Sequence, residues 1–545
     1  MSCIAPPRRD FGAGTAGAAP FADARRRLPA LAGAAALATA CGPAWADLLA
    51  EEVWQGWRAL AAESGQQLSA ASAERDGDTL TARGVMLSGH GDGLGLMVEL
   101  DEIAFKETSD GTVSVRMTDA YELVVQGDDG TRLRLAIRHP GLLLEVSETG
   151  AGLHHDLSAP EIAVQLAEFS GPEAPDQAAL SLSALRVAAQ YGVSRDALGT
   201  TTADMTAGAL DFDMSLREEG DAIDLDYAAT GLAMRFAGAG LDRGARIGMG
   251  DMGGALAAGF ALDFALDHET QRYAIDSLED GETVNIAGRS TNGRTRFVLD
   301  GAELAFHSES RNGELTMPAE ALIPALAGGI GATGAPVVMP PGAIGPVTLR
   351  AGEVAYGVRL PTGGAPQAQD ATALLRLVDI TAPETVWAML DPSGALPRMP
   401  VTAVLDLGAE AVLPDDLFGM GTMLGFMMGG AFEVVRPTAL DIRELVLRFA
   451  GSELVGDGAF TLDATDLETF PGLPRPTGSL NLTLRGSEAL IDTMVEAGLL
   501  PPDQANAARL LIALLGRPGD APGELVSTIE IDETGAVLTN GMRLR

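Results

Sequence analysis

The sequence contains one lysine and two cysteines among 545 residues, and this scarcity excludes several kinds of catalytic site. The lysine, Lys106, lies in Ala-Phe-Lys-Glu-Thr, which matches neither a Walker A loop nor a Ser-x-x-Lys motif. Lys106 therefore gives no support to P-loop or Schiff-base chemistry. The cysteines, Cys3 and Cys41, both lie close to the N-terminus.

Positive charge is also scarce, with 37 Lys and Arg against 75 Asp and Glu and a formal net charge of −38. Because phosphate backbones repel such a chain, we expect no nucleic-acid partner. Aromatic residues make up 5% of the sequence and hydrophobic residues 46%, which is enough for a packed core. The 67 glycines favour turns and β-structure over helical bundles.

Motifs for cofactors and nucleophiles are missing or lack the right context. Gly248 to Gly253 matches G-x-G-x-x-G, but the preceding residues 241–244, Leu-Asp-Arg-Gly, do not form a buried strand. We therefore predict a glycine-rich loop there and no cofactor. No G-x-S-x-G elbow is present.

The histidine and aspartate residues of the sequence also lack the spacing of a metal site. His154 and His155 are adjacent, and neighbouring residues of a strand point to opposite faces, so they seldom bind one ion. Asp221, Asp224 and Asp226 lack the spacing and glycine of an EF-hand loop. We predict no metal site, no catalytic residue and a protein that is not an enzyme.

The N-terminus has the pattern of an export signal. Arg25-Arg26-Arg27 precede an apolar stretch from Leu28 to Ala40, and Ala44-Trp45-Ala46 forms a small-x-small site. The apolar stretch is shorter than the roughly 20 residues that a membrane span needs. We therefore predict a signal peptide over residues 1–46, cleaved between Ala46 and Asp47, and no transmembrane segment in the mature chain.

Two variants of this export signal stay open. Ala38-Thr39-Ala40-Cys41 is similar to a lipoprotein box, and lipid anchoring would then occur at Cys41. Arg8-Arg9 is similar to a twin-arginine signal that lies well upstream of the apolar stretch. Cleavage after Ala46 would remove both cysteines, five arginines and two acidic residues, leaving a thiol-free periplasmic protein with net charge −41.

After a helix predicted over 47–63, the apolar pattern changes to a period of two. Leu94 to Leu100, Arg132 to Arg138 and Ile223 to Tyr227 alternate apolar with mostly polar residues, which is typical of antiparallel strands with one packed face. Turn sequences separate the predicted strands between about 68 and 316. The predicted turns are Asp76-Gly77-Asp78, Asp110-Gly111, Asp128-Asp129-Gly130, Asn292-Gly293 and Asn312-Gly313.

Residues 328–346 are rich in Gly, Pro and Ala and predict a linker or long loop. Helices are predicted beyond it over 385–390, 415–428, 487–497 and 502–515, between further strands. The expected fold is mainly β (α+β), with long curved antiparallel sheets and a few inserted helices, mostly in the C-terminal half. We expect an N-terminal section over 47–327 and a C-terminal section over 347–545.

The predicted helix over 415–428 is rich in methionine. Its apolar side chains predict either core packing or an adaptable surface for a lipid or a partner protein. The candidate surface residues are Phe418, Met420, Met423 and Met427.

Several stretches together resemble a bacterial protein family. They are Val53-Trp54 with residues 74–80, Glu-Arg-Asp-Gly-Asp-Thr-Leu; residues 386–397, Val-Trp-Ala-Met-Leu-Asp-Pro-Ser-Gly-Ala-Leu-Pro; and segments from Phe470 to Gly541. This pattern resembles an uncharacterised family of alphaproteobacterial exported proteins, domain-of-unknown-function family 2125 (DUF2125). The resemblance implies a periplasmic location and supplies no catalytic residue. At the level of fold, the chain is more distantly similar to AsmA-type envelope proteins, which are linked to lipid handling.

These observations lead to one functional expectation and two alternatives. We expect an exported envelope protein without enzymatic activity, whose curved sheet binds a lipid or a partner protein. The first alternative is an exported hydrolase or glycan-acting enzyme with paired carboxylates. The second is a purely structural interaction protein. The sequence does not indicate the ligand or the oligomeric state.

Overall fold

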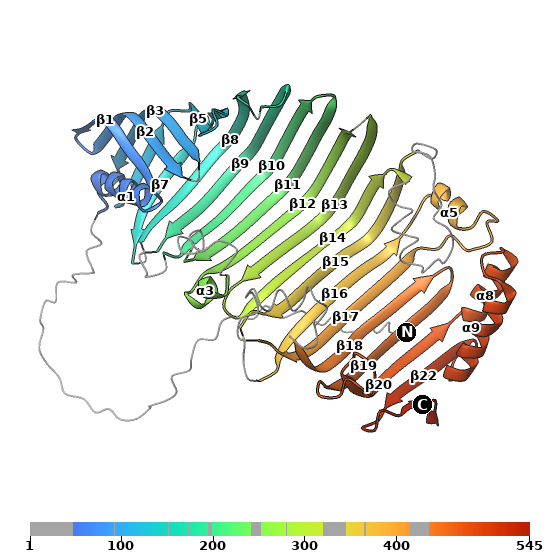
Figure 1. Cartoon of the computed structure of the whole chain (residues 1–545). Helices are drawn as coiled ribbons and strands as arrows, with labels where there is room; N and C mark the ends of the chain where they lie inside the picture. Colours follow the sequence, from blue (N-terminus) through green and yellow to red (C-terminus); the bar gives the residue numbers. More distant parts are fainter. Residues whose placement is uncertain are drawn as a thin grey trace, which may run out of the picture. The chain divides into compact units, whose positions relative to one another are not determined.

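The computed structural model describes residues 47–545 except 92, 151, 173, 195–198, 241–251, 280, 320–344, 364–366 and 415–434. Residues 1–46, with the predicted signal peptide and both cysteines, lie outside the described residues. A single compact unit begins at Asp47. Its strands form one sheet of 24 strands, shown in Figure 1.

The N-terminal part contains helix α1 and eight strands. Their bounds are α1 Ala50–Glu63, β1 Gln66–Asp76, β2 Thr79–Gly91, β3 Leu94–Glu107, β4 Val113–Met117, β5 Ala120–Gly127, β6 Arg132–Arg138, β7 Leu143–Thr149 and β8 Gly152–Ser170.

The described residues in the middle of the chain form long strands and one short helix. Their bounds are β9 Gln177–Val193, β10 Thr201–Glu218, β11 Asp221–Ala239, α3 Met252–Ala257, β12 Ala261–Glu279, β13 Glu282–Leu299, β14 Glu303–Met317, β15 Val347–Pro361 and β16 Gln369–Ile380.

In the described residues of the C-terminal part, three helices lie between strands. The bounds are α5 Glu384–Leu390, β17 Val401–Val412, β18 Arg436–Phe449, β19 Ser452–Asp463, β20 Arg475–Arg485, α8 Ser487–Glu496, α9 Pro502–Leu515, β21 Arg517–Pro518, β22 Glu524–Ile531, β23 Val537–Thr539 and β24 Met542–Arg543.

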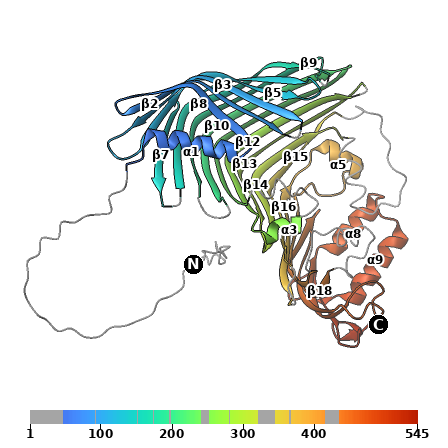
Figure 2. The ribbon, with the colours of Figure 1, turned by 60° about the vertical axis from the view of Figure 1, so that its left-hand side comes forward.

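The strand order is simple because nearly every strand pairs with its neighbours in sequence. From β8 to β20 each strand is antiparallel to the next, and β20 then pairs with β22. Near the N-terminus, three further pairs join strands that are not consecutive: β3 with β5, β4 with β7 and β6 with β8. The prediction of a mainly β protein with antiparallel sheets is confirmed, and Figure 2 shows the sheet bending along its length.

Helix α1 packs its apolar side against the first strands. Val53 and Trp54 are buried with Phe105 of β3, and the Trp54 and Phe105 ring centroids are 5.9 Å apart. The Glu52 carboxylate accepts a hydrogen bond from the Leu49 backbone N–H at 3.0 Å and so caps the helix start. Gly65, with φ +73°, follows the end of the helix.

Helices α5, α8 and α9 are also confirmed, whereas the methionine-rich helix predicted over 415–428 lies outside the described residues. The longest helices of the described residues, α1 and α9, have 14 residues each. None of the described helices is both long enough and apolar enough to cross a membrane.

Three of the five predicted turns are confirmed, and two predictions are wrong. Asp76-Gly77-Asp78, Asp110-Gly111 and Asp128-Asp129-Gly130 lie at strand ends. Asn292-Gly293 and Asn312-Gly313 lie inside β13 and β14, which continue past them. Asn292 and Asn312 both have φ +48°, and this left-handed conformation suits a bulge in a strand as well as a hairpin turn.

These bulges belong to a line of left-handed residues that crosses the sheet. One interior residue has positive φ in each of β9, β11, β13, β14 and β16: Arg186, Gly231, Asn292, Asn312 and Asp379. Such a residue reverses the alternation of side chains, so apolar residues before and after it reach the same face. In β9, for example, Ala184 and Val187 lie three positions apart but share one buried cluster.

The predicted division at 328–346 falls mostly on residues that the structure does not describe. The strands on either side, β14 and β15, are paired from Glu303 with Pro361 to Met317 with Val347. A separation into two sections stays a prediction.

Candidate functional site

One face of the sheet carries apolar side chains in rows that run across the strands. The central row of this apolar face joins directly paired residues from β8 to β22. These are His155, Tyr191, Ala203, Phe236, Phe264, Phe297, Phe306, Val358, Ala373, Leu407, Ile442, Gly458, Leu480 and Ile529. The row crosses 14 strands, which corresponds to about 60 Å at the usual strand spacing.

A second row of the apolar face runs beside the first. It consists of Leu157, Ala189, Met205, Met234, Leu266, Thr295, Ser308, Tyr356, Leu375, Leu405, Leu445, Gly456, Leu482 and Ser527. Neither row contains Asp, Glu, Lys or Arg. Beyond the line of bulges, the face continues with a row of Leu180, Met214, Leu225, Ile275 and Ile286.

Much of the apolar face is only partly covered by other described residues. Tyr356 is 47% exposed, Leu375 42% and Val284 41%. Four further side chains are exposed on this face, namely Ile223, Val358, Leu360 and Leu447. Exposed apolar side chains that gather on one face of a soluble protein commonly mark a binding site.

The charged residues lie on the opposite face, where they pair across strands. Glu314 of β14 lies between Arg289 at 2.7 Å and Arg350 at 2.9 Å. These hydrogen bonds lower the pKa of Glu314 to about 2. Arg294 similarly pairs with Asp267 at 2.8 Å. The polar face therefore accounts for many of the charges in the described strands and leaves the apolar face free of them.

The described helices pack on the apolar face. Helix α1 covers its N-terminal end through the cluster with Phe105. Leu256 of α3 packs against Leu299 and Phe297. Val386 of α5 packs against Val347, and Leu511 and Ile512 of α9 lie over β20 and β22.

His155 of β8 lies where α1 meets the apolar face. Its Nε2 accepts a hydrogen bond from the Trp57 indole N–H at 3.0 Å, and its ring stacks on Tyr191 with a centroid separation of 4.1 Å. His155 is 3% exposed, and this burial is the main cause that lowers its pKa from 6.5 to about 4. The imidazole is therefore neutral at pH 7 and acts in packing.

Acidification should destabilise the protein through His155. Between pH 6.5 and about 4 the unfolded chain binds a proton at this site that the folded protein excludes, so stability falls as the pH falls. The full loss amounts to about 3 kcal/mol. Chemical denaturation at pH 7.5 and at pH 4.5 measures most of this loss. His155→Phe should flatten the pH dependence, whereas His90→Gln, at a side chain that is 64% exposed, should leave it unchanged. A wild-type slope that persists in His155→Phe would assign the effect elsewhere.

The candidate metal ligands lie apart from one another or have other partners. His154 precedes buried His155 on β8 and so points to the opposite face. Asp224 pairs with Arg217 at 2.7 Å. No group of three or more potential metal ligands occurs in the described part of the chain.

One pair of neighbouring carboxylates is relevant to the hydrolase alternative, which requires two acidic side chains close together. Asp226 of β11 lies directly opposite Asp213 of β10, and their hydrogen bond raises the pKa of Asp226. The pair lines a shallow hollow of about 550 Å³ on the polar face. Neighbouring carboxylates on an open strand surface do not identify a substrate, and the enzymatic alternative stays a prediction.

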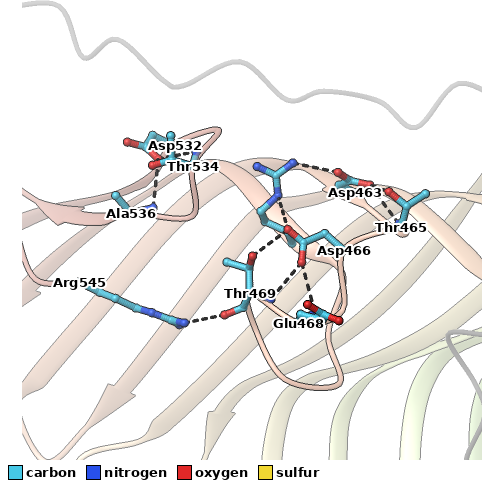
Figure 3. A network of polar contacts seen from close by, with 10 residues as sticks. Asp463, Thr465, Asp466, Glu468, Thr469, Asp532, Thr534, Ala536 and Arg545 are labelled. Carbon is cyan, nitrogen blue, oxygen red and sulfur yellow. Dashed lines mark hydrogen bonds and ion pairs between the residues drawn. The ribbon is translucent and has the colours of Figure 1, made fainter.

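Acidic residues near the C-terminus shape turns, as Figure 3 shows. The Asp466 carboxylate accepts hydrogen bonds from the backbone N–H groups of Glu468 and Thr469, and Asp532 accepts one from Thr534. Arg475 joins Asp463 at 2.9 Å and Asp466 at 3.0 Å. These carboxylates satisfy local backbone donors, which is a structural role.

The stretch over 386–397, from Val386 to Pro397, also has a structural role. Asp391 is 1% exposed, and its carboxylate accepts hydrogen bonds from the Ser393 hydroxyl at 2.6 Å and the Leu396 N–H at 2.8 Å. These bonds, with that of Arg398, hold the pKa of Asp391 well below its usual range. The Arg398 guanidinium also lies 5.0 Å from the centre of the Trp387 ring.

The predicted apolar surface at Phe418, Met420, Met423 and Met427 lies outside the described residues. The sequence predicted that the curved sheet binds a lipid or a partner protein, but it did not indicate which residues of the sheet do so. The signal was present in the alternation of strands such as β10 and β11, where Phe212 and Tyr227 alternate with aspartates. The registers that align these residues into rows are visible only in the structure.

Residues 324–544 match the family described as "Uncharacterized protein conserved in bacteria (DUF2125)". The resemblance to this family is thereby confirmed over the C-terminal part, which includes the stretch over 386–397. No curated protein and no solved structure matches the chain. The likeness to AsmA-type proteins therefore stays a prediction.

Proposed function

We propose that this chain, whose residues 324–544 match the DUF2125 family, binds the acyl chains of lipids along the apolar face of its sheet. The observation that carries the proposal is the pair of uncharged rows that cross 14 strands. An ordinary soluble protein covers such a face with helices or a second sheet. Here several of its side chains remain exposed between the described helices.

Hydrocarbon is the ligand that best matches this chemistry. Each methylene that leaves water contributes about 0.8 kcal/mol, and an apolar surface supplies this without specific polar contacts. The face is about 60 Å long, roughly four times the depth of one bilayer leaflet. The face therefore has room for several acyl chains. Because its two rows carry no charge, the charged headgroups would lie in the solvent or at the edges of the face.

A direct test begins with the purified full chain. Mass spectrometry of its organic extract should find co-purified phospholipid or fatty acid. After removal of bound lipid, titration with a fluorescent fatty acid should give saturable binding that unlabelled fatty acid displaces. A folded, lipid-free protein that gives no saturable binding would contradict the proposal.

We further propose that the lipid-binding protein acts in the periplasm after cleavage between Ala46 and Asp47. The coincidence of Asp47 with the start of the compact unit supports this site. The N-terminal sequence of the protein recovered from a periplasmic extract should begin at Asp47. Recovery of only the uncleaved chain from the cytoplasm would overturn the proposed location.

A further inference from the structure

A small apolar cavity lies beneath helix α9, at the C-terminal end of the apolar face. Its volume is about 150 Å³, and its walls come from α9 and from β19, β20 and β22. Leu482 and Ile529 of its lining also belong to the two apolar rows. The cavity is therefore continuous with the face proposed to bind lipid.

The lining contains no charged side chain and offers almost no polar atom to a ligand. Ser527 is its polar side chain, and its hydroxyl lies 3.4 Å from the Thr539 hydroxyl. A hollow of this volume with apolar walls has room for a small hydrocarbon such as benzene. Its contents should thus be a hydrocarbon segment of about six carbon atoms.

Helix α9 forms the outer wall of this cavity and is held at its ends. Ala505 is fully buried near its start, and the Leu515 carbonyl oxygen accepts a hydrogen bond from the Asn540 side-chain amide at 2.8 Å. Arg509 forms an ion pair with Asp492 of α8. Between these anchors Leu510 is 71% exposed and Leu511 is 57% exposed. Leu511 also lines the cavity, so its side chain lies where the cavity meets the solvent.

We propose that this cavity receives the methyl end of one acyl chain, whose remainder lies on the apolar face. This inference rests on the proposed function and adds a defined position for the methyl end of the bound acyl chain. The methyl end fits because it lacks polar atoms, whereas a carboxylate or phosphate would lose its hydration without a partner.

Two photoreactive fatty acids test the inference on the purified full chain. One carries a diazirine at the methyl end, and the other carries it beside the carboxylate. After irradiation and peptide mass spectrometry, the methyl-end probe should label residues 475–531, and the carboxyl-end probe should label the apolar face elsewhere.

Matched variants separate the cavity from the rest of helix α9. Ile512→Trp fills the cavity and should reduce methyl-end labelling of residues 475–531 at least tenfold. Leu510→Trp, which adds a similar side chain at an exposed position outside the lining, should leave the labelling unchanged. Circular dichroism checks that both variants fold. If Ile512→Trp does not fold, Leu515→Phe adds less volume to the same cavity and should show the same direction of change.

The outcomes distinguish this inference from the proposed function. Methyl-end labelling that occurs only on β9 to β16 would overturn the cavity assignment and leave acyl-chain binding in place. Unchanged labelling in folded Ile512→Trp would also overturn the cavity assignment. Absence of labelling on the whole apolar face would overturn both proposals.

Discussion

Leu375→Asp should weaken acyl-chain binding at least tenfold. Leu375 of β16 is 42% exposed on the apolar face, directly opposite Tyr356 on β15 and Leu405 on β17. A carboxylate there would have to lose hydration against hydrocarbon without a positive partner, which costs several kcal/mol. A difference of 1.4 kcal/mol already corresponds to a tenfold change in affinity. Titration with the fluorescent fatty acid measures the loss.

The matched control for this variant is Thr372→Asp on the same strand. Thr372 lies opposite Arg359 on the polar face, so the new carboxylate meets water and a guanidinium. Its affinity for fatty acid should remain within twofold of wild type. Equal losses in the two variants would show that binding does not depend on which face carries the charge.

The largest effect on folding stability is expected from Trp387→Ala, in the stretch over 386–397. Trp387 is 6% exposed and lies in one cluster with Leu396, Ala450 and side chains of α8 such as Leu490. It thus joins α5 to α8 and to the turn after β18. Truncation of a buried tryptophan typically lowers the free energy of unfolding by about 3–5 kcal/mol. Urea denaturation followed by circular dichroism measures the change.

Glu384→Ala provides the control on the same helix. The Glu384 side chain is 71% exposed and pairs with Arg398 at 3.1 Å. An exposed ion pair contributes about 0–1 kcal/mol, so this variant should unfold close to wild type. If Trp387→Ala retained wild-type stability but lost lipid binding, the stretch over 386–397 would have a functional role that its packing does not show.

Local patterns in the sequence were sufficient to predict most of the helices in the described residues and the β character of the fold. Apolar residues recur with a period of two in Leu94 to Leu100 and of three to four in Val53 and Trp57. Such a period is visible in a single sequence because the buried side of a strand or helix must be apolar. The Asn-Gly pairs misled for a physical reason. Left-handed Asn292 fits either a turn or a bulge, and only the partner strand decides between them. Conversely, Ala450-Gly451 forms the actual turn between β18 and β19 without a strong turn signal.

The presence of an apolar face on the sheet was predictable, but the residues that form it were not. Phe236, Phe264, Phe297 and Phe306 come from four successive strands, and only the observed registers place them side by side. The bulges also change which residues face the same side, so simple alternation along a strand gives the wrong face beyond Asn292 or Gly231. The packing role of His155 was not predictable from the sequence, because the Trp57 side chain that it contacts lies 98 residues away along the chain.

Site-specific photo-crosslinking tests the central claim most directly. A benzophenone amino acid would replace Tyr273, Phe306 or Leu375 on the apolar face, and in parallel their sequence neighbours Arg272, His307 or Leu374 on the polar face. The full chain would be produced in bacteria with radiolabelled lipids and irradiated in the cells. The account predicts lipid adducts at the three apolar positions and background levels at the three polar ones. Equal labelling of both faces, or no lipid adduct at any position of the folded protein, would contradict it.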